Sequence, residues 1–272
     1  MKTDLVLAPF DASVAELIEA AQAADAGGFD AVWTYDHYSG LVTGRNWSRD
    51  PFVALGAIGA TTERINVGVL VANANNRHPA QLACAVNSLQ SVAPGRVLLG
   101  LGAGASPASR WSSEQAAIGQ PAAGAATRRA LLIETIQAVR AIWAGEQFDG
   151  HHVCAAASMA VVDGAPIPPI IIGSSSTGTT EVACGYADGV NLLPGDDLAE
   201  RIEFTRSRTS MPSHTSWPFE ISVFKALDVD HPLGGDPTQF TDLGVDRRTL
   251  YVTAPYPIDR IAAIARALAG ST

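Results

Sequence analysis

The chain has 272 residues, of which 47% are hydrophobic and 17% charged, so it is long enough to bury one large core. Its formal net charge is −9 and it contains only two lysines, which leaves no basic stripe for a nucleic-acid backbone. No stretch reaches the ~18 apolar residues of a membrane-spanning helix, and the first residues do not resemble a signal peptide. We therefore expect a soluble, cytoplasmic protein that acts on a small-molecule substrate, with no nucleic-acid or membrane partner.

Short runs rich in β-branched residues alternate with longer segments of helical period, a pattern typical of repeated βα units around a parallel sheet. The predicted strands are residues 2–8, 31–35, 65–71, 96–101, 169–173, 189–193, 219–227 and 249–253. The predicted helices are residues 13–26, 51–62, 79–92, 127–144, 179–186, 197–208, 237–243 and 257–269. Eight strands and eight helices predict a closed (β/α)8 TIM barrel that forms a single domain over residues 1–272.

Two segments depart from this repeat. Residues 105–126 are rich in Ala, Ser and Gly, and residues 147–168 carry the pair His151-His152. We predict that both are excursions in or near the fourth βα unit, of the kind that often cover a barrel mouth. The histidine pair lacks the Glu-x-x-His or i,i+4 spacing of a helical metal site, so no metal site is predicted.

The three cysteines, Cys84, Cys154 and Cys184, are isolated and lack the paired spacing of a zinc site or a disulfide framework. This usage fits a reducing compartment. We predict that they are buried and serve as small apolar side chains.

Asp36 and His37 follow the second predicted strand in the sequence FDAVWTYDHYSG. Because the loops after the strands carry the active site of a (β/α)8 barrel, this carboxylate and imidazole are the predicted catalytic residues. The alternative for His37 is an ordinary loop histidine with a hydrogen-bond partner. Asp36 could orient His37, bind the polar edge of a ring or serve as a turn residue, and the sequence leaves these roles open.

Loops after three further strands offer ligand contacts. Glycines after the fourth strand allow a flat ring to approach the backbone, although tight packing at a strand end would also require them. After the fifth strand, six consecutive small or hydroxyl residues open a helix, where N–H groups and the helix dipole favour a phosphate; a capped turn has the same composition. The candidates are Asn73 after the third strand, Gly102, Ala103, Gly104, Ala105 and Ser106 after the fourth, and Gly173, Ser174, Ser175, Ser176, Thr177 and Gly178 after the fifth.

Four spaced segments carry a family resemblance: GGFDAVWTYDH, RINVGVLVANANNRHPAQLACAVNSLQSVAPGRVLLGLGAG, RRALLIETIQAVRAIWAGEQFDG and PPIIIGSSSTGTTEVACGYADGV. In this order they resemble the bacterial luciferase-like superfamily of flavin- and deazaflavin-dependent oxidoreductases, over residues 4 to about 193. The resemblance implies a barrel with the cofactor ring in its C-terminal mouth and the cofactor phosphate after the fifth strand. Val71, Ala72 and Asn73 would back the ring, and a non-prolyl cis peptide is expected between Val69 and Asn73.

The pair Asp36-His37 resembles the Asp-His of coenzyme F420-dependent members more than the Glu-His or His-His of many flavin mononucleotide (FMN) monooxygenases. The resemblance thus implies an F420-dependent oxidoreductase that transfers a hydride between the deazaflavin and an unidentified organic substrate. His37 would act near the reacting carbon as a proton donor or acceptor, and Asp36 would fix it. Arg45, Arg77 and Arg110 are candidates for contacts with the acidic tail of F420.

One departure bears on the substrate. Ala105 follows Gly104, whereas the sugar-phosphate dehydrogenases of this group carry an acidic residue there, which argues against sugar-phosphate oxidation by that acid. An FMN-dependent luciferase-like monooxygenase and a non-catalytic cofactor-binding relative are the alternatives. A Schiff-base enzyme using Lys225 and a metal hydrolase are disfavoured, the latter because no His-x-His pair ends the first strand. Relatives often dimerise, and the Ala-rich helices fit a homodimer.

Overall fold

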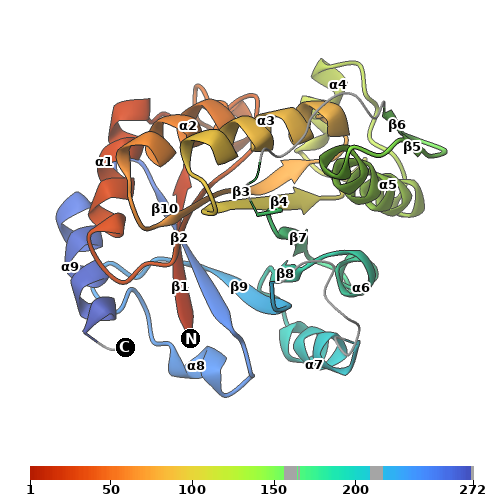
Figure 1. Cartoon of the computed structure of the whole chain (residues 1–272). Helices are drawn as coiled ribbons and strands as arrows, with labels where there is room; N and C mark the ends of the chain where they lie inside the picture. The colour runs from red at the N-terminus through yellow and green to blue at the C-terminus, as the bar shows by residue number, and fades with distance from the viewer. Residues whose placement is uncertain (156–163, 165, 209–216, 271–272) are drawn as a thin grey trace.

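The computed structural model describes residues 1–155, 164, 166–208 and 217–270 (Figure 1). Within these ranges, eight parallel strands close into a barrel in the order β1-β10-β9-β8-β7-β4-β3-β2. They are β1 (Lys2–Ala8), β2 (Ala31–Thr34), β3 (Asn66–Asn73), β4 (Val97–Gly102), β7 (Ile170–Ser174), β8 (Gly189–Leu192), β9 (Glu220–Ala226) and β10 (Arg247–Thr253). The predicted (β/α)8 barrel is thus confirmed, with strand ends that differ from the predicted ones by no more than two residues.

Helices alternate with the barrel strands and form the outer layer. They are α1 (Val14–Asp25), α2 (Pro51–Thr61), α3 (Pro79–Val92), α5 (Ala125–Ala144), α6 (Thr177–Tyr186), α7 (Leu198–Arg208), α8 (Thr238–Thr241) and α9 (Ile258–Ala269). The first helix starts with a capping box, in which the Glu16 N–H donates to the Ser13 hydroxyl and the Ser13 N–H donates to the Glu16 carboxylate. The predicted helix over residues 237–243 is only four residues long, because a turn ending at Gly244 (φ 73°) replaces its last turn.

Two excursions separate β4 from β7, as predicted. The first contains α4 (Ser112–Ala117), and the second contains a short antiparallel hairpin of β5 (Phe148–Asp149) and β6 (Cys154–Ala155). Figure 1 shows α4, β5 and β6 grouped around α5 on one side of the barrel. Residues 156–163 and 165 of the second excursion lie outside the described residues.

Side chains that alternate along the strands divide the core into two clusters. Leu5 and Leu7 of β1 pack outward against the helices, whereas Val6 points into the barrel with Trp33 and Leu98. Trp33 is 2% exposed, and a Cβ atom on Gly68 would lie 2.5 Å from its ring. A glycine on β3 therefore makes room for the indole that fills the barrel interior.

A network of charged side chains closes the N-terminal end of the barrel. Buried Asp4 accepts a hydrogen bond from the Trp33 indole (2.8 Å) and pairs with Arg247, whose Nε donates to Glu220 (3.0 Å). Lys2 pairs with the other oxygen of Glu220. Burial raises the pKa of Asp4 to about 6, even though Arg247 opposes the shift. This end of the barrel holds a residual cavity of only about 20 Å³.

The cysteine prediction was wrong. Cys84 and Cys154 are exposed and Cys184 is partly buried, and all three are free thiols. Cys84 lies on the outer face of α3, and Cys154 lies on the exposed hairpin, where its thiol donates to the Asp149 carboxylate (3.2 Å). Among the described residues, no helix is both long and apolar enough to cross a lipid bilayer.

Candidate active site

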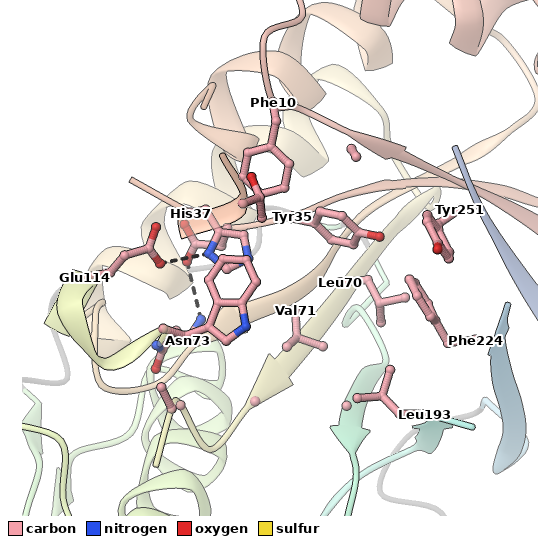
Figure 2. A pocket seen from close by; sticks show the side chains of 18 of the residues that line it. Phe10, Tyr35, His37, Leu70, Val71, Asn73, Glu114, Leu193, Phe224 and Tyr251 are labelled. Atoms are coloured by element: carbon pink, nitrogen blue, oxygen red, sulfur yellow. Dashed lines mark hydrogen bonds and ion pairs between the residues drawn. The ribbon is translucent and has the colours of Figure 1, made fainter. Parts of the chain in front are cut away.

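A cavity of about 770 Å³ lies at the C-terminal ends of the strands. Figure 2 shows how side chains from several strands and from α4 converge on it. Its lining includes, from the predicted site, Asp36, His37, Val71, Asn73, Gly102, Ala103, Gly104, Ala105 and Gly173. It also includes Phe10, Tyr35, Arg45, Arg110, Trp111, Glu114, Leu193, Phe224 and Tyr251. Residues chosen from the sequence at the ends of β2, β3, β4 and β7 therefore meet at one cavity.

His37 is held by the first excursion. Its Nδ1 lies 2.8 Å from Oε2 of Glu114, a residue of α4 whose side chain is only 6% exposed. The other Glu114 oxygen accepts hydrogen bonds from the backbone N–H groups of Tyr38 (3.1 Å) and Ser39 (3.3 Å). The Trp111 indole stacks on the imidazole, with ring centroids 4.3 Å apart. Because a carboxylate only accepts hydrogen bonds, the Nδ1–H of His37 donates to Glu114, and Nε2 is left to exchange a proton with a ligand.

Asp36 does not contact His37 through a hydrogen bond. It binds Arg77 in a bidentate pair, with Nε and Nη2 at 2.9 and 2.8 Å from its two oxygens. Arg77 Nη2 also donates to Asp50 (2.7 Å). Burial alone would lower the pKa of Arg77, but the hydrogen bonds and charge of Asp36, followed by those of Asp50, raise it above its ordinary value. The interpretation that Asp36 fixes His37 was therefore wrong, because both Asp36 oxygens bind Arg77 and the His37 Nδ1 binds Glu114.

The structure also shows where the other basic residues near the site lie. Because its Nε and Nη2 contact the carboxylates of Asp36 and Asp50 and it does not line the cavity, Arg77 is engaged inside the protein and not directed at an acidic ligand there. His78 caps α3, with its Nδ1 accepting the Ala80 N–H (3.2 Å). Lys225 points to the outer layer, where its Nζ lies 5.4 Å from the Phe240 ring centroid. Arg45 and Arg110 do line the cavity.

Aromatic side chains form the wall opposite the glycine-rich loops. Phe224 and Tyr251 stack with ring centroids 4.9 Å apart and planes 2° from parallel, and Tyr35 lies 6.3 Å from Phe224. Burial, followed by the neighbouring Tyr251, raises the pKa of Tyr35 well above its usual range. Tyr35 therefore stays a neutral phenol that can donate a hydrogen bond.

The glycine-lined side of the cavity is shaped for close approach of a ligand. The Leu70–Val71 peptide is cis, within the predicted range, and the ladder between β3 and β4 shifts register between Val69 and Ala72. A Cβ atom on Gly173 would lie 2.8 Å from Val71 Cγ1. Gly104 has a φ of 76°, and a Cβ there would lie 2.2 Å from the Asn75 amide nitrogen. Only glycine fits these two positions without displacing a neighbour.

The loop after β7 forms the start of α6. The Ser176 hydroxyl accepts the Thr179 N–H at the helix N-cap, and the buried Ser174 hydroxyl contacts that of Thr180 (3.0 Å). Arg129 of α5 lies beside this helix start, since a Cβ on Gly178 would be 3.2 Å from its Nη1. Helix N–H groups, hydroxyls and a guanidinium thus gather at one point, which is the donor set that a phosphate requires.

Several predicted contacts do not line the cavity. Ala72 is buried behind it, and Ser106 and the residues from Ser174 to Gly178 lie outside its lining. Their predicted contacts with a cofactor remain predictions. Within the described ranges, no group of three or more His, Cys, Asp or Glu side chains has a geometry that could hold a metal ion.

Sequence reasoning missed Glu114 and Trp111, which lie in the excursion over residues 105–126. It also missed Arg128, whose Nη1 donates to the Gly104 carbonyl (2.6 Å) and fixes the loop after β4. The available signal was an acid and an aromatic residue in a polar, Ala-rich segment predicted to cover the mouth. Their distance from His37 along the chain concealed the contact.

A model of the luciferase-like monooxygenase family matches residues 3–230. The chain belongs to this family. It is 35% identical over 176 residues to an F420-dependent hydroxymycolic acid dehydrogenase of Mycobacterium tuberculosis, which covers 64% of this chain and 47% of the relative. The chain spans about half the length of the curated relatives it matches.

Solved structures of low sequence identity share the fold of this family member. An F420-dependent secondary alcohol dehydrogenase in complex with an F420-acetone adduct superposes with a TM-score of 0.75 at 15% identity, over 97% of both chains. The oxygenating constituent of 3,6-diketocamphane monooxygenase from Pseudomonas putida, in complex with FMN, gives a TM-score of 0.72 at 16% identity, over 99% of this chain and 98% of the other. The same barrel thus occurs with either cofactor.

Proposed function

We propose that the protein is an F420-dependent oxidoreductase that moves a hydride between the deazaflavin and an organic substrate. The observation that carries this proposal is the pair His37 and Glu114 at the edge of a large cavity, in a chain similar to F420-dependent dehydrogenases. The deazaflavin supplies the hydride chemistry when it is bound, whereas the protein provides geometry and a proton route.

His37 is the proposed proton donor and acceptor. The Nδ1–H donates a hydrogen bond to Glu114 and Trp111 stacks on the ring, so the imidazole is held with Nε2 available. Nε2 takes a proton from a substrate hydroxyl in the oxidative direction and returns it to a carbonyl oxygen in the reductive direction. Glu114 is a positioning residue in this scheme, and Asp36 stabilises the loop through Arg77.

The glycine-lined side of the cavity fits a flat ring. Val71 and Asn73 on β3 and Gly102 to Ala105 after β4 face the cavity without large side chains. The start of α6, with Ser176, Thr177 and the adjacent Arg129, would hold a phosphate. Arg110, which is exposed at the rim, is available to the acidic tail of F420.

The test is a titration of the full chain with F420 and, separately, with FMN, followed by fluorescence quenching. We expect F420 to bind and FMN to bind at least about 10-fold more weakly, a difference of about 1.4 kcal/mol. The His37→Ala variant should keep F420 binding but lose turnover, because its imidazole handles the proton and not the cofactor. If wild type and His37→Ala both bind F420 and turn over substrate at the same rate, the proposed role of His37 is contradicted.

The second candidate is an FMN-dependent monooxygenase, which the similarity to the FMN-bound Pseudomonas putida structure keeps open. Tight FMN binding together with no binding of F420 would favour it. Binding of neither cofactor would favour a non-catalytic relative.

A further inference from the structure

The loop after β4 has its backbone carbonyl groups occupied by neighbouring segments. Three successive carbonyls accept hydrogen bonds from outside the loop, those of Gly102, Ala103 and Gly104. The first accepts a hydrogen bond from the Ala74 N–H (3.1 Å) and the second from the Asn75 side-chain amide (2.8 Å), both just after β3. The third accepts a hydrogen bond from Arg128 Nη1 on α5 (2.6 Å). The acceptors of this loop are therefore turned toward the segment after β3 and toward the outer helix layer.

The N–H groups of the same loop face the opposite way. In a trans peptide the C=O of one residue and the N–H of the next point in opposite directions, and the cis peptides of the described chain lie elsewhere, at Leu70–Val71 and Ala254–Pro255. The N–H groups of Ala103, Gly104 and Ala105 thus point to the side on which these residues line the cavity. Within the described part of the chain, none of the three donates a hydrogen bond. Three adjacent donors are therefore open to a ligand.

Arg128 brings a positive charge to the back of this loop. Its Nε is buried without a hydrogen-bond partner, and in the ranges that the structure describes its guanidinium forms no ion pair. A cation that donates to the Gly104 carbonyl polarises that peptide and makes the Ala105 N–H on its far side a stronger donor. Because a partly buried cation without a counter-charge is costly, an electron-rich ligand at these N–H groups would stabilise it.

We propose that Arg128 and Asn75 hold the loop after β4 so that its N–H groups bind the carbonyl edge of the cofactor ring, more tightly when the ring is reduced. The inference rests on the proposed function, because it assigns how the same site holds its cofactor. Deazaflavin and flavin rings both contain a pyrimidinedione, whose oxygens are richer in electrons in the reduced ring and therefore accept stronger hydrogen bonds. Arg128 and Asn75 are positioning residues, since they do not line the cavity and act through the loop.

The experiment measures the dissociation constants of oxidised and reduced F420 and, separately, of oxidised and reduced FMN, by calorimetry of the full chain without oxygen. In Arg128→Met the ratio of the oxidised to the reduced dissociation constant should fall by about 10-fold, which lowers the reduction potential of the bound cofactor by about 30 mV for a two-electron couple. Arg128→Lys keeps a cation that can donate to the Gly104 carbonyl and should restore part of the ratio. Arg266→Met, which removes an exposed charge from α9, is the control and should leave the ratio unchanged.

The ratio separates positioning from a general loosening of the loop, because a loosened loop weakens the binding of both cofactor forms equally. Equal weakening of the two forms in Arg128→Met, or an unchanged ratio, would overturn the proposal. Asn75→Ala tests the same loop through the Ala103 carbonyl and should lower the ratio by about 3-fold or more. Melting temperatures verify that each variant folds, and Asn75→Ala decides the question if Arg128→Met does not.

The two cofactors distinguish a failure of this inference from a failure of the proposed function. If wild type binds FMN but not F420, and the FMN ratio depends on Arg128, the proposed function is rejected and the role of the loop stands. If F420 binds with a ratio that does not depend on Arg128, the proposed function stands and the role of the loop is rejected. Binding of neither cofactor would reject both.

Discussion

The two ends of this barrel treat polar groups in opposite ways. At the N-terminal end, Asp4, Arg247, Glu220 and Lys2 satisfy one another around Trp33, and about 20 Å³ of space remains. At the C-terminal end, a cavity of about 770 Å³ keeps the Tyr35 hydroxyl and one imidazole nitrogen of His37 available. Both ends contain an acid that orients a neighbouring group, but only the second leaves donors and acceptors for a ligand. Comparing the two ends distinguishes buried polar groups that stabilise the fold from polar groups that are available to bind a ligand.

The largest expected effect is a loss of stability caused by a substitution at the N-terminal end of the barrel. Arg247→Met leaves the buried Asp4 carboxylate without its cation and leaves Glu220 with Lys2 alone, so we expect the free energy of unfolding to fall by about 3–5 kcal/mol. Urea denaturation followed by circular dichroism measures it. The matched control is Arg208→Met, which removes an exposed pair with Glu181 and should cost less than about 1 kcal/mol. Similar losses for both variants would show that burial at this end contributes nothing.

The second prediction concerns a substitution that fills part of the cavity at the C-terminal end of the barrel. Gly173→Asp places a Cβ that would lie 2.8 Å from Val71 and adds a carboxylate beside the proposed ring site, so F420 affinity should fall by about 100-fold or more. Fluorescence titration measures the dissociation constant. Gly56→Asp is the control, because a Cβ there meets no atom within 4 Å. If Gly173→Asp binds F420 as tightly as wild type does, the deazaflavin ring does not lie against β7.

The third prediction concerns the orientation of the imidazole. In wild type the Glu114 carboxylate should hold the proton on His37 Nδ1, whereas Glu114→Gln presents an amide N–H to Nδ1 and should shift the proton to Nε2. Nitrogen-15 NMR of the histidine side chains, assigned with a His37→Gln variant, reports the tautomer without any turnover assay.

If that shift occurs, turnover should fall by about 10- to 100-fold with little change in KM, because Nε2 no longer accepts a proton. The control is Glu63→Gln, which neutralises an exposed carboxylate far from the cavity. An Nε2-protonated His37 in the wild-type protein would contradict the positioning role of Glu114.

The smallest expected effect concerns the phenol of Tyr35, which lines the cavity. Because burial raises the pKa of Tyr35 well above its usual range, this phenol should stay neutral from about pH 7 to pH 10. The ultraviolet absorbance of tyrosinate, compared between wild type and Tyr35→Phe over this range, measures the ionisation. A tyrosinate signal near pH 10 that is present in wild type and absent from Tyr35→Phe would show that the phenol ionises and is exposed.

The local parts of the fold could be read from the sequence. The Ser13 and Glu16 capping box, the prolines that open α2 and α3, and the β-branched runs placed the elements because these signals act between residues close in the chain. The period of alternating strands and helices then predicted the barrel, and the rule that strand ends carry the site led to Asp36, His37 and the glycines after β4, which line the cavity.

The sequence did not predict which side chains form hydrogen bonds with Asp36 and His37. Asp36 and His37 are adjacent, but Asp36 binds Arg77 from the third unit, and His37 binds Glu114 from the excursion after the fourth. Both contacts join residues more than 40 positions apart, since Asp36 and Arg77 are separated by 41 positions and His37 and Glu114 by 77. Composition, patterning and turn chemistry determined the barrel and the loops that meet at its mouth. Only the closed barrel decided which side chains satisfy one another and which remain open to a ligand, because that depends on distances in space and on burial.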